Sequence, residues 1–494
     1  MKKLGILFLL IITTLFIFSC NDSKHNKATQ KREIISFENY KRNTLQSLDS
    51  ITISQKNKLV QYLKTIRSLA SNAIKDKALL SFFKQKIAFQ KIKDKELPKE
   101  IIEKAKSVES NLISHYITNY NQFYNILMID ADGNIIYTIR KEKALNQNIF
   151  DKKFANTLLY KKLKNNTNES FVDFQFYEIS NEPSAFFIEP IFEENRLMGW
   201  FVLQFSITKI NSIFDRSDKL GETGEVILVN KNHYMLTDSR FIPESTILKQ
   251  QLADNNITEK FKLKEGHKTV TDYRGYKVIS SFKVFHFWDS EWLIIAKINQ
   301  AEVLTDYFKN HTAQFYNCLE SALKSRKYEY MNFSPLPNQK EVNIDEIKRI
   351  EQSETVHTKG LSTCTGLLVY LPNKFAYLAH ISPYDKIYNE TKTDIVGHLM
   401  NRIDYIEISK AQKQLLKFII VAPEIATAKN ITNRLINEGI FLNQIKLLTK
   451  GDNRSSEITY QCGKSDAVIT MHINDKVTYL STSQIPELDN EICL

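Results

Sequence analysis

The 494-residue chain is poor in cysteine, glycine and proline, with 5, 13 and 10 residues of these types. No two cysteines form a Cys-x-x-Cys pair or a metal-ligand spacing, so the sequence predicts no metal site, and no cofactor is expected. Beyond Cys20 no apolar stretch reaches the roughly 20 residues that a membrane helix needs. The net charge is +11, but the basic residues are scattered and not grouped with aromatics, so no nucleic-acid partner is expected.

The composition is that of folded protein. Hydrophobic residues make up 43% of the chain and charged residues 25%, which argues against extensive disorder. At about 150 residues per domain, a chain of this length holds roughly three domains.

The N-terminus has the features of an export signal. Lys2 and Lys3 precede an apolar run from Leu4 to Ser19, which is short for a membrane span and typical of a signal-peptide core. Its end, Ile-Phe-Ser-Cys, resembles a lipoprotein cleavage box. We therefore expect residues 1–19 to be removed, Cys20 to carry lipid, and residues 20–35 to tether the protein outside the cytoplasm of a bacterium. An uncleaved membrane anchor is the alternative.

A helical region and then a series of strands follow. From Ile34 to Ile117 glycine is almost absent, and leucines and isoleucines between Leu45 and Leu69 recur at helical spacing, while Pro98 begins a further helix. Strands are predicted at Tyr124–Ile129 and Ile135–Ile139 around an Asp-Ala-Asp-Gly-Asn turn. Further strands are expected at Ala185–Phe192, Gly199–Ser206, Gly224–Val229, Tyr234–Asp238 and Trp292–Ala296, with helices at Phe154–Leu163 and Ile207–Arg216. These alternations predict an α+β fold with antiparallel sheets.

Several segments resemble double Cache sensor domains. Ile129–Thr138 is similar to the first, membrane-distal repeat of that family. Further similarities span the link into the second repeat and its closing strands: Leu220–Glu225, Leu228–Asn230, Asp238–Phe241, Tyr273–Val278 and Trp292–Ala296. The resemblance covers residues 36–304 and implies an extracytoplasmic sensor of small molecules. It further implies that Tyr137, Arg140, Asp173 and Tyr177 line a ligand pocket in the first repeat, the alternative being ordinary strand and loop residues.

A cysteine and a histidine near the C-terminus form a candidate catalytic pair. Cys364 precedes one apolar run and His380 ends the next, and a turn at Pro372–Lys374 would join two strands and bring the side chains together. A nucleophilic thiol needs a neighbouring base, and the base needs a group that orients it. Thr358 is the candidate for this third role. His357 is a competitor for the base.

The stretch around this pair resembles the chemoreceptor glutamine deamidases, CheD. The similar segments are Thr358–Cys364 and Leu378–His380. The resemblance implies a cysteine amidohydrolase in which Cys364 attacks a protein glutamine, His380 moves the proton and Thr358 orients His380. The backbone amides of Thr363 and Cys364 would hold the oxyanion. The sequence departs from the family at Tyr377-Leu378, where paired glycines are usual, and at Thr449–Asp452.

Residues 305–342 are interpreted as a linker, broken at Pro335–Asn338, and residues 343–494 as a layered α/β domain. That domain is expected to contain helices at Asp394–Ile403 and Ala426–Glu438 and strands at Leu416–Ala422, Ile445–Leu448 and Ala467–Ile473. Cys462 and Cys493 are candidates for a disulfide.

Two functions follow from the sequence. The first is a Cache sensor fused to a protein-glutamine deamidase, which predicts a depressed pKa for Cys364. The second is a non-catalytic sensor or adaptor that binds a ligand only. A peptidase or transglutaminase that uses the same cysteine is a third reading.

Overall fold

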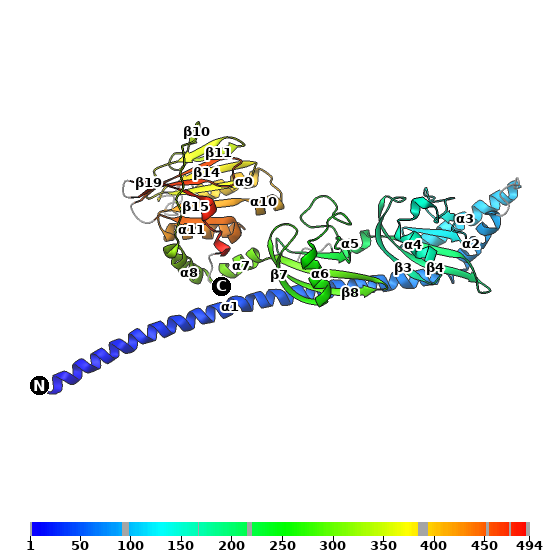
Figure 1. Cartoon of the computed structure of the whole chain (residues 1–494), viewed down its shortest axis with the longest axis horizontal. Coiled ribbons are helices and arrows are strands. Elements are labelled where there is room, and N and C mark those ends of the chain that lie inside the picture. The colour runs from blue at the N-terminus through cyan, green and yellow to red at the C-terminus, as the bar shows by residue number, and fades with distance from the viewer. Residues whose placement is uncertain are drawn as a thin grey trace. The chain divides into compact units, whose positions relative to one another are not determined.

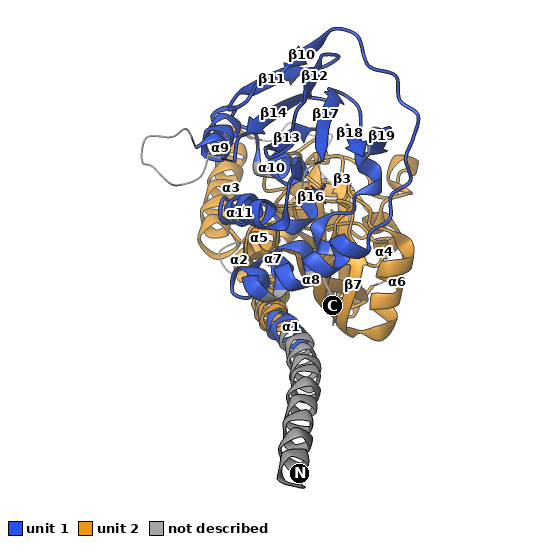
Figure 2. Cartoon of the chain, turned by 90° about the vertical axis from the view of Figure 1, so that its left-hand side faces the viewer, with its two compact units in different colours: residues 1–44, 300–494 blue, residues 45–299 orange. Residues whose placement is uncertain are grey.

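The computed structural model of the chain falls into two compact units, residues 45–299 and residues 1–44 together with 300–494 (Figures 1 and 2). It describes residues 2–90, 98–165, 167–214, 220–383, 394–450, 454–473 and 476–490; within these ranges side chains are described from residue 37 onward, except at Gln314, Cys318, Lys410 and Asn490. The predicted signal peptide and the lipidation residue Cys20 lie outside the described side chains, as does Cys318.

The N-terminal helical region is divided into three helices, α1 Lys2–Ala73, α2 Lys77–Gln90 and α3 Lys99–Asn119. The predicted apolar face of α1 is confirmed, because Leu59, Leu63 and Ile66 are buried. The break after Ala73 comes from Asp76, whose carboxylate accepts hydrogen bonds from the amides of Ala78 (2.9 Å) and Leu79 (3.2 Å) at the start of α2.

The first repeat of unit 45–299 is an antiparallel sheet of order β2-β1-β5-β4-β3. Its strands are β1 Asn125–Asp130, β2 Ile135–Thr138, β3 Ser170–Tyr177, β4 Glu182–Glu193 and β5 Arg196–Ser206, accompanied by η1 Lys152–Phe154, α4 Leu158–Asn165 and α5 Thr208–Phe214. The predicted hairpin is confirmed. Asp130 closes its turn by accepting the amides of Asp132 (3.0 Å) and Asn134 (2.8 Å).

The second repeat is an antiparallel sheet of order β6-β9-β8-β7. Its elements are β6 Glu225–Asn230, α6 Asp254–Leu263, β7 Glu265–Thr271, β8 Lys277–Phe287 and β9 Ser290–Asn299. The strand predicted at Tyr234–Asp238 was wrong, since only isolated bridges at Tyr234 and Met235 form there. The Asn230 side chain accepts the amides of Asn232 and Tyr234 (3.0 Å each), and such local bonds compete with a strand ladder.

The segment predicted as a linker also differs from the prediction. Helices α7 Gln300–Lys309 and α8 Thr312–Ser325 occupy much of it, and their apolar residues belong to the core of the C-terminal unit. Leu304, Phe308, Phe315 and Leu319 are all buried there. The Pro335–Asn338 stretch lies outside any helix or strand, as its prolines predict.

The C-terminal unit contains two sheets, of order β10-β12-β17-β18-β19 and β11-β14-β13-β15-β16. The strands of the first are β10 Gln339–Glu341, β12 Thr355–Thr358, β17 Ser455–Gln461, β18 Val468–Ile473 and β19 Lys476–Ser481. Those of the second are β11 Ile347–Glu351, β13 Thr365–Leu371, β14 Phe375–Ile381, β15 Lys417–Ala422 and β16 Ile445–Thr449. The helical elements are α9 Ile395–Tyr405, α10 Lys410–Leu415, α11 Ile425–Asn437, η2 Leu442–Gln444, η3 Thr482–Gln484 and η4 Leu488–Asn490.

Two apolar clusters show how these elements are layered. Leu367, Val369 and Tyr377 pack with residues of α7, α8, α9 and α11 on one face of the β13–β14 sheet. Leu368, Tyr370 and Leu378 point the other way and pack with residues of β12, β17 and β18. The second sheet is therefore sandwiched between helices and the first sheet, as the alternation of side chains along a strand dictates.

Gly199, at the start of the β5 pairing with β1, tests the packing of the first repeat. A Cβ there would lie 2.0 Å from the carbonyl oxygen of Ile129, whereas one at Gly275 would meet nothing within 4 Å. Both glycines have positive φ. We expect Gly199→Ala to destabilise the protein by at least about 2 kcal/mol and Gly275→Ala by only about 1 kcal/mol, as measured by thermal denaturation. Equal losses would contradict the close approach of β1 and β5.

Candidate functional site

Thr358 and His380, predicted from the sequence to act together, are hydrogen bonded. Thr358 ends β12 and His380 lies on β14, and the Thr358 Oγ1 to His380 Nδ1 distance is 2.8 Å. The Thr358 hydroxyl donates its own proton to the carbonyl of Val342, at 2.8 Å. Thr358 Oγ1 must therefore accept from His380, which places the histidine proton on Nδ1 and leaves Nε2 as an acceptor.

His380 Nε2 is buried and has no hydrogen-bond partner within the described residues. Both side chains are almost completely enclosed, with exposed fractions of 0% for Thr358 and 2% for His380. A buried histidine nitrogen without a partner keeps its lone pair available to a proton donor that enters the site.

Cys364 lies in the same layer between the two sheets. His380 pairs with Gly366 across β13 and β14, and Cys364 precedes Gly366 by two residues, so it occupies the diagonal position on the same face. Cys364 belongs to the apolar cluster between the two sheets, which confirms that its side chain points into this layer. A Cβ at Gly366 would lie 2.4 Å from Cδ1 of Ile458 on β17. The glycine therefore lets the two sheets approach each other closely next to Cys364 and His380.

The loop in front of Cys364 lies at the surface. Gly360, Ser362 and Thr363 are exposed, while Cys364 is 7% exposed. Within the described chain, no hydrogen bond is donated by the backbone amides of Thr363 and Cys364. The oxyanion role of these two amides stays a prediction.

The electrostatics correct one prediction. Burial raises the pKa of the Cys364 thiol above its ordinary value, although the Thr363 hydroxyl and the Lys450 ammonium act in the opposite direction. Burial also lowers the pKa of His380. The expected depressed cysteine pKa was therefore wrong, because loss of hydration disfavours the charged form of each group. The resting pair is a neutral thiol and a neutral imidazole.

Lys450, which contacts the loop before this cysteine, was not among the predicted site residues. Its side chain is 2% exposed and donates hydrogen bonds to the carbonyls of Ser362 and Arg454. Burial lowers the pKa of Lys450 to about 8, and interaction with Cys364 acts against this shift. The sequence signal was present in the Thr449–Asp452 segment, but only the fold shows that Lys450 meets the cysteine loop.

His357, the competing base, neighbours Thr358 on β12 and so faces the opposite side of its sheet. Its Nδ1 has no partner among the described residues, and burial lowers its pKa. Cys462 is a buried free thiol; Cys493, its predicted disulfide partner, lies outside the described residues. Across the described residues no cluster of histidine, cysteine, aspartate or glutamate could hold a metal ion.

Two of the four predicted ligand residues of the first repeat, Tyr137 and Arg140, have protein partners. Tyr137 donates to Glu109 of α3 at 3.2 Å, and its ring packs edge-on against Phe82 of α2. Arg140 donates to the carbonyl of Tyr124 at 2.6 Å. These two residues are thus held by protein partners.

Asp173 and Tyr177 lie on β3 and differ in their partners. The indole of Trp292 on β9 donates to both oxygens of Asp173, at 3.0 and 2.9 Å, which links the two repeats. Tyr177 is buried in the core of the first repeat, and its hydroxyl has no partner in the part of the chain that is described. Trp200 Nε1, in the same cluster, is likewise unpartnered.

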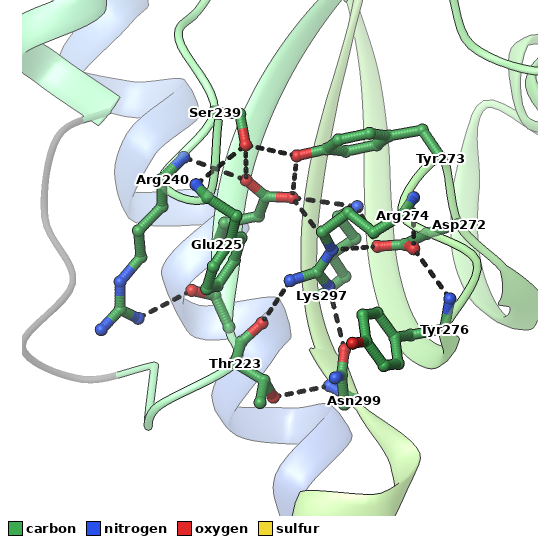
Figure 3. A network of polar contacts seen from close by, with 12 residues as sticks. Thr223, Glu225, Ser239, Arg240, Asp272, Tyr273, Arg274, Tyr276, Lys297 and Asn299 are labelled. Carbon is green, nitrogen blue, oxygen red and sulfur yellow. Dashed lines mark hydrogen bonds and ion pairs between the residues drawn. The ribbon is translucent and has the colours of Figure 1, made fainter. Parts of the chain in front are cut away.

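A buried charge network fixes the β7–β8 turn of the second repeat (Figure 3). Lys297 Nζ lies 2.6 Å from Asp272 and 3.0 Å from Glu225, and Arg274 Nε lies 2.7 Å from Asp272. Tyr273 donates to Glu225 at 2.7 Å. Burial alone would raise the pKa of Asp272, but Lys297 and Arg274 lower it. Two anions and two cations thus neutralise each other inside the protein.

A family model for the Cache domain matches residues 37–307. The chain belongs to the Cache domain family. This confirms the resemblance found over residues 36–304. Cache domains are extracellular sensor domains that bind small-molecule ligands. Among the helices whose side chains are described, none has an apolar stretch suited to crossing a membrane.

Solved structures similar to this Cache domain include the periplasmic sensory domain of the Campylobacter jejuni chemoreceptor Tlp1, at 14% identity and a TM-score of 0.37, covering 54% of this chain and 98% of that one. The ligand-binding domain of the Pseudomonas aeruginosa PAO1 amino acid chemoreceptor PctB, in complex with L-Gln, is 13% identical with a TM-score of 0.34, covering 53% and 92%. A domain of a sensory box/GGDEF family protein from Vibrio parahaemolyticus is 14% identical with a TM-score of 0.36, covering 54% and 98%. No curated protein matches the chain in sequence.

The raised pKa of Cys364 predicts how the thiol reacts. Alkylation by iodoacetamide should rise with pH and reach half its maximum above about pH 8.5, the ordinary value for cysteine, because only the thiolate reacts. Lys450→Met should move this midpoint higher, since it removes a positive charge that favours the thiolate. Lys359→Met, in the same loop but paired with Glu341, should leave it unchanged. Full reactivity at pH 7 would contradict the neutral pair.

Proposed function

We propose that this chain is an extracellular sensor in which a small-molecule-binding Cache domain is joined to a cysteine-dependent amidohydrolase that resembles the protein-glutamine deamidases. A lipid on Cys20 would hold it at a bacterial membrane. The observation that carries the enzymatic part is the Thr358–His380 hydrogen bond, which leaves His380 Nε2 free in the layer that holds Cys364.

In the first step, Cys364 Sγ attacks the side-chain amide carbon of a glutamine while the thiol proton passes to His380 Nε2. A neutral thiol beside a neutral imidazole suits this transfer, because the base acts only as the carbon–sulfur bond forms. The amides of Thr363 and Cys364 would stabilise the negative carbonyl oxygen, and Lys450 adds a nearby positive charge.

In the second step, the carbon–nitrogen bond breaks and His380 gives its proton to the departing ammonia, which leaves a glutamyl thioester. Water then attacks the thioester with His380 as base, and glutamate and the free thiol are released. Thr358 keeps the imidazole in one tautomer throughout, since its oxygen accepts the Nδ1 proton.

In the Cache domain, the first repeat supports a ligand site around Tyr177. Its hydroxyl is buried without a partner among the described residues, and such a group is usually satisfied by a ligand or water. Arg140 would border this site, because Glu182 interacts with both Arg140 and Glu142, and Glu142 interacts with Tyr177. Tyr137 and Asp173 would then shape the repeat and not touch the ligand.

A second candidate function is a sensor or adaptor without catalysis. The observation that favours it is the burial of Cys364 together with its raised pKa, which also fits an inert core thiol. In that case the C-terminal unit would act only by binding.

The activity prediction uses a peptide library with a central glutamine and measures ammonia release. Cys364→Ala should abolish turnover, and His380→Ala should lower it by about 10²–10⁴-fold, the range for a lost general base. Thr358→Val should lower it at least about tenfold, because the imidazole loses its orienting acceptor. Thr358→Ser keeps the hydroxyl and should retain most of the activity.

Thermal denaturation of the same variants shows whether a loss of activity comes from a misoriented His380 imidazole or from unfolding of the protein. Thr358→Val should cost about 1–3 kcal/mol, because it leaves the Val342 carbonyl and the His380 nitrogen unpaired in a buried site. Ammonia release that is equal in the original protein and in Cys364→Ala would contradict the enzyme and favour the adaptor.

A further inference from the structure

The second repeat of the Cache domain encloses a small cavity between α6 and its sheet. The cavity has a volume of about 50 Å³. Apolar side chains, among them Ile227 and Ile295, line one part, and Lys260, Asp272 and Lys297 line another. A cavity of this size holds up to roughly four waters, or one organic molecule of a few non-hydrogen atoms.

Lys260 is the unusual member of this lining. It projects from α6 and is 2% exposed. Its ammonium donates one long hydrogen bond, 3.4 Å to the carbonyl of Asn256, and lies 5.7 Å from the centroid of the Phe282 ring. Among the described residues, no carboxylate lies within ion-pair distance of it, although an ammonium has three donors to satisfy.

The neighbouring charges do not neutralise Lys260. In the network of Figure 3, Asp272 and Glu225 are matched by Lys297 and Arg274, so that network carries no net charge. Lys260 adds one positive charge to the same cavity. An unpaired buried charge destabilises the protein, and a bound anion would offset this loss.

We propose that this cavity is a binding site for a short-chain monocarboxylate, such as acetate or propionate, whose carboxylate pairs with Lys260. The size of the cavity and its apolar wall suit a short hydrocarbon tail, and the single uncompensated cation suits one negative charge. Asn256 also lines the cavity, and its side-chain amide would supply a second donor to the carboxylate. The inference extends the proposed sensing function to a second site and does not depend on the chemistry of Cys364.

Proton linkage supports the assignment. Burial lowers the pKa of Lys260 to about 8, so the ammonium form persists at neutral pH. The titratable and charged groups around it are Glu259, Lys268, Asp272, Tyr273 and Lys297. Carboxylate binding should therefore be strongest below pH 8 and weaken as the pH rises through this value, because the bound anion requires the protonated lysine.

Isothermal titration calorimetry of the purified full chain with acetate and with propionate tests the site. Lys260→Met should weaken binding at least about tenfold, since the ion pair is lost, while its melting temperature should hold or rise. Lys262→Met, at an exposed lysine of the same helix, should leave binding unchanged.

Asn256→Asp provides a variant that keeps Lys260. A carboxylate four residues before Lys260 on α6 would pair with it inside the protein, so the melting temperature should rise and carboxylate binding should fall. The proposal is overturned if neither acid binds the original protein, or if Lys260→Met binds as tightly as it does. Cys364→Ala should bind both acids normally, which distinguishes failure of this site from failure of the enzymatic proposal.

Discussion

The alternation of side chains along β13 and β14 is the constraint on which the C-terminal unit depends. Residues of one parity, such as Leu367 and Tyr377, enter the helix-covered core, and residues of the other parity enter the layer between the sheets. Cys364 and His380 share that second parity, and Thr358 reaches the same layer from β12. A shift of one residue in the β13–β14 register would send the cysteine and the histidine to opposite layers. The strand register that packs the domain is therefore also the register that places the candidate site residues in one layer.

A buried lysine lies beside each of the two candidate sites, and burial has the same effect on both. Lys450 lies next to the Cys364 loop and Lys260 next to the cavity of the second repeat, and burial lowers the pKa of each to about 8. A fold that removes an ammonium from water without a carboxylate partner loses stability. Lys450 donates to the carbonyls of Ser362 and Arg454, and Lys260 donates only to that of Asn256.

Local patterns in the sequence predicted much of this structure. The hairpin from Tyr124 and the apolar face of α1 follow from residues close in sequence. Thr358 and His380 lie on strands of two different sheets, and their contact was predicted from the resemblance to the deamidases. The break at Asp76 and the loop at Tyr234 were missed because side-chain hydrogen bonds to the backbone override helical and strand patterns.

Properties set by burial could not be predicted from the residues. The direction of the Cys364 pKa shift depends on how far the thiol is removed from water, and Lys260 and Lys450 look like surface lysines until the fold encloses them. The partner of Tyr137 likewise comes from α3, which no strand pattern brings to it.

The central claim is that Thr358 fixes His380 as a neutral imidazole whose free Nε2 faces the layer of Cys364. Nitrogen NMR of the protein with labelled histidine, assigned with His380→Gln, tests it most directly. The account predicts a proton on Nδ1 and an unprotonated Nε2 at neutral pH, and a loss of this tautomer preference in Thr358→Val. A proton on Nε2, or an imidazolium at neutral pH, would contradict it.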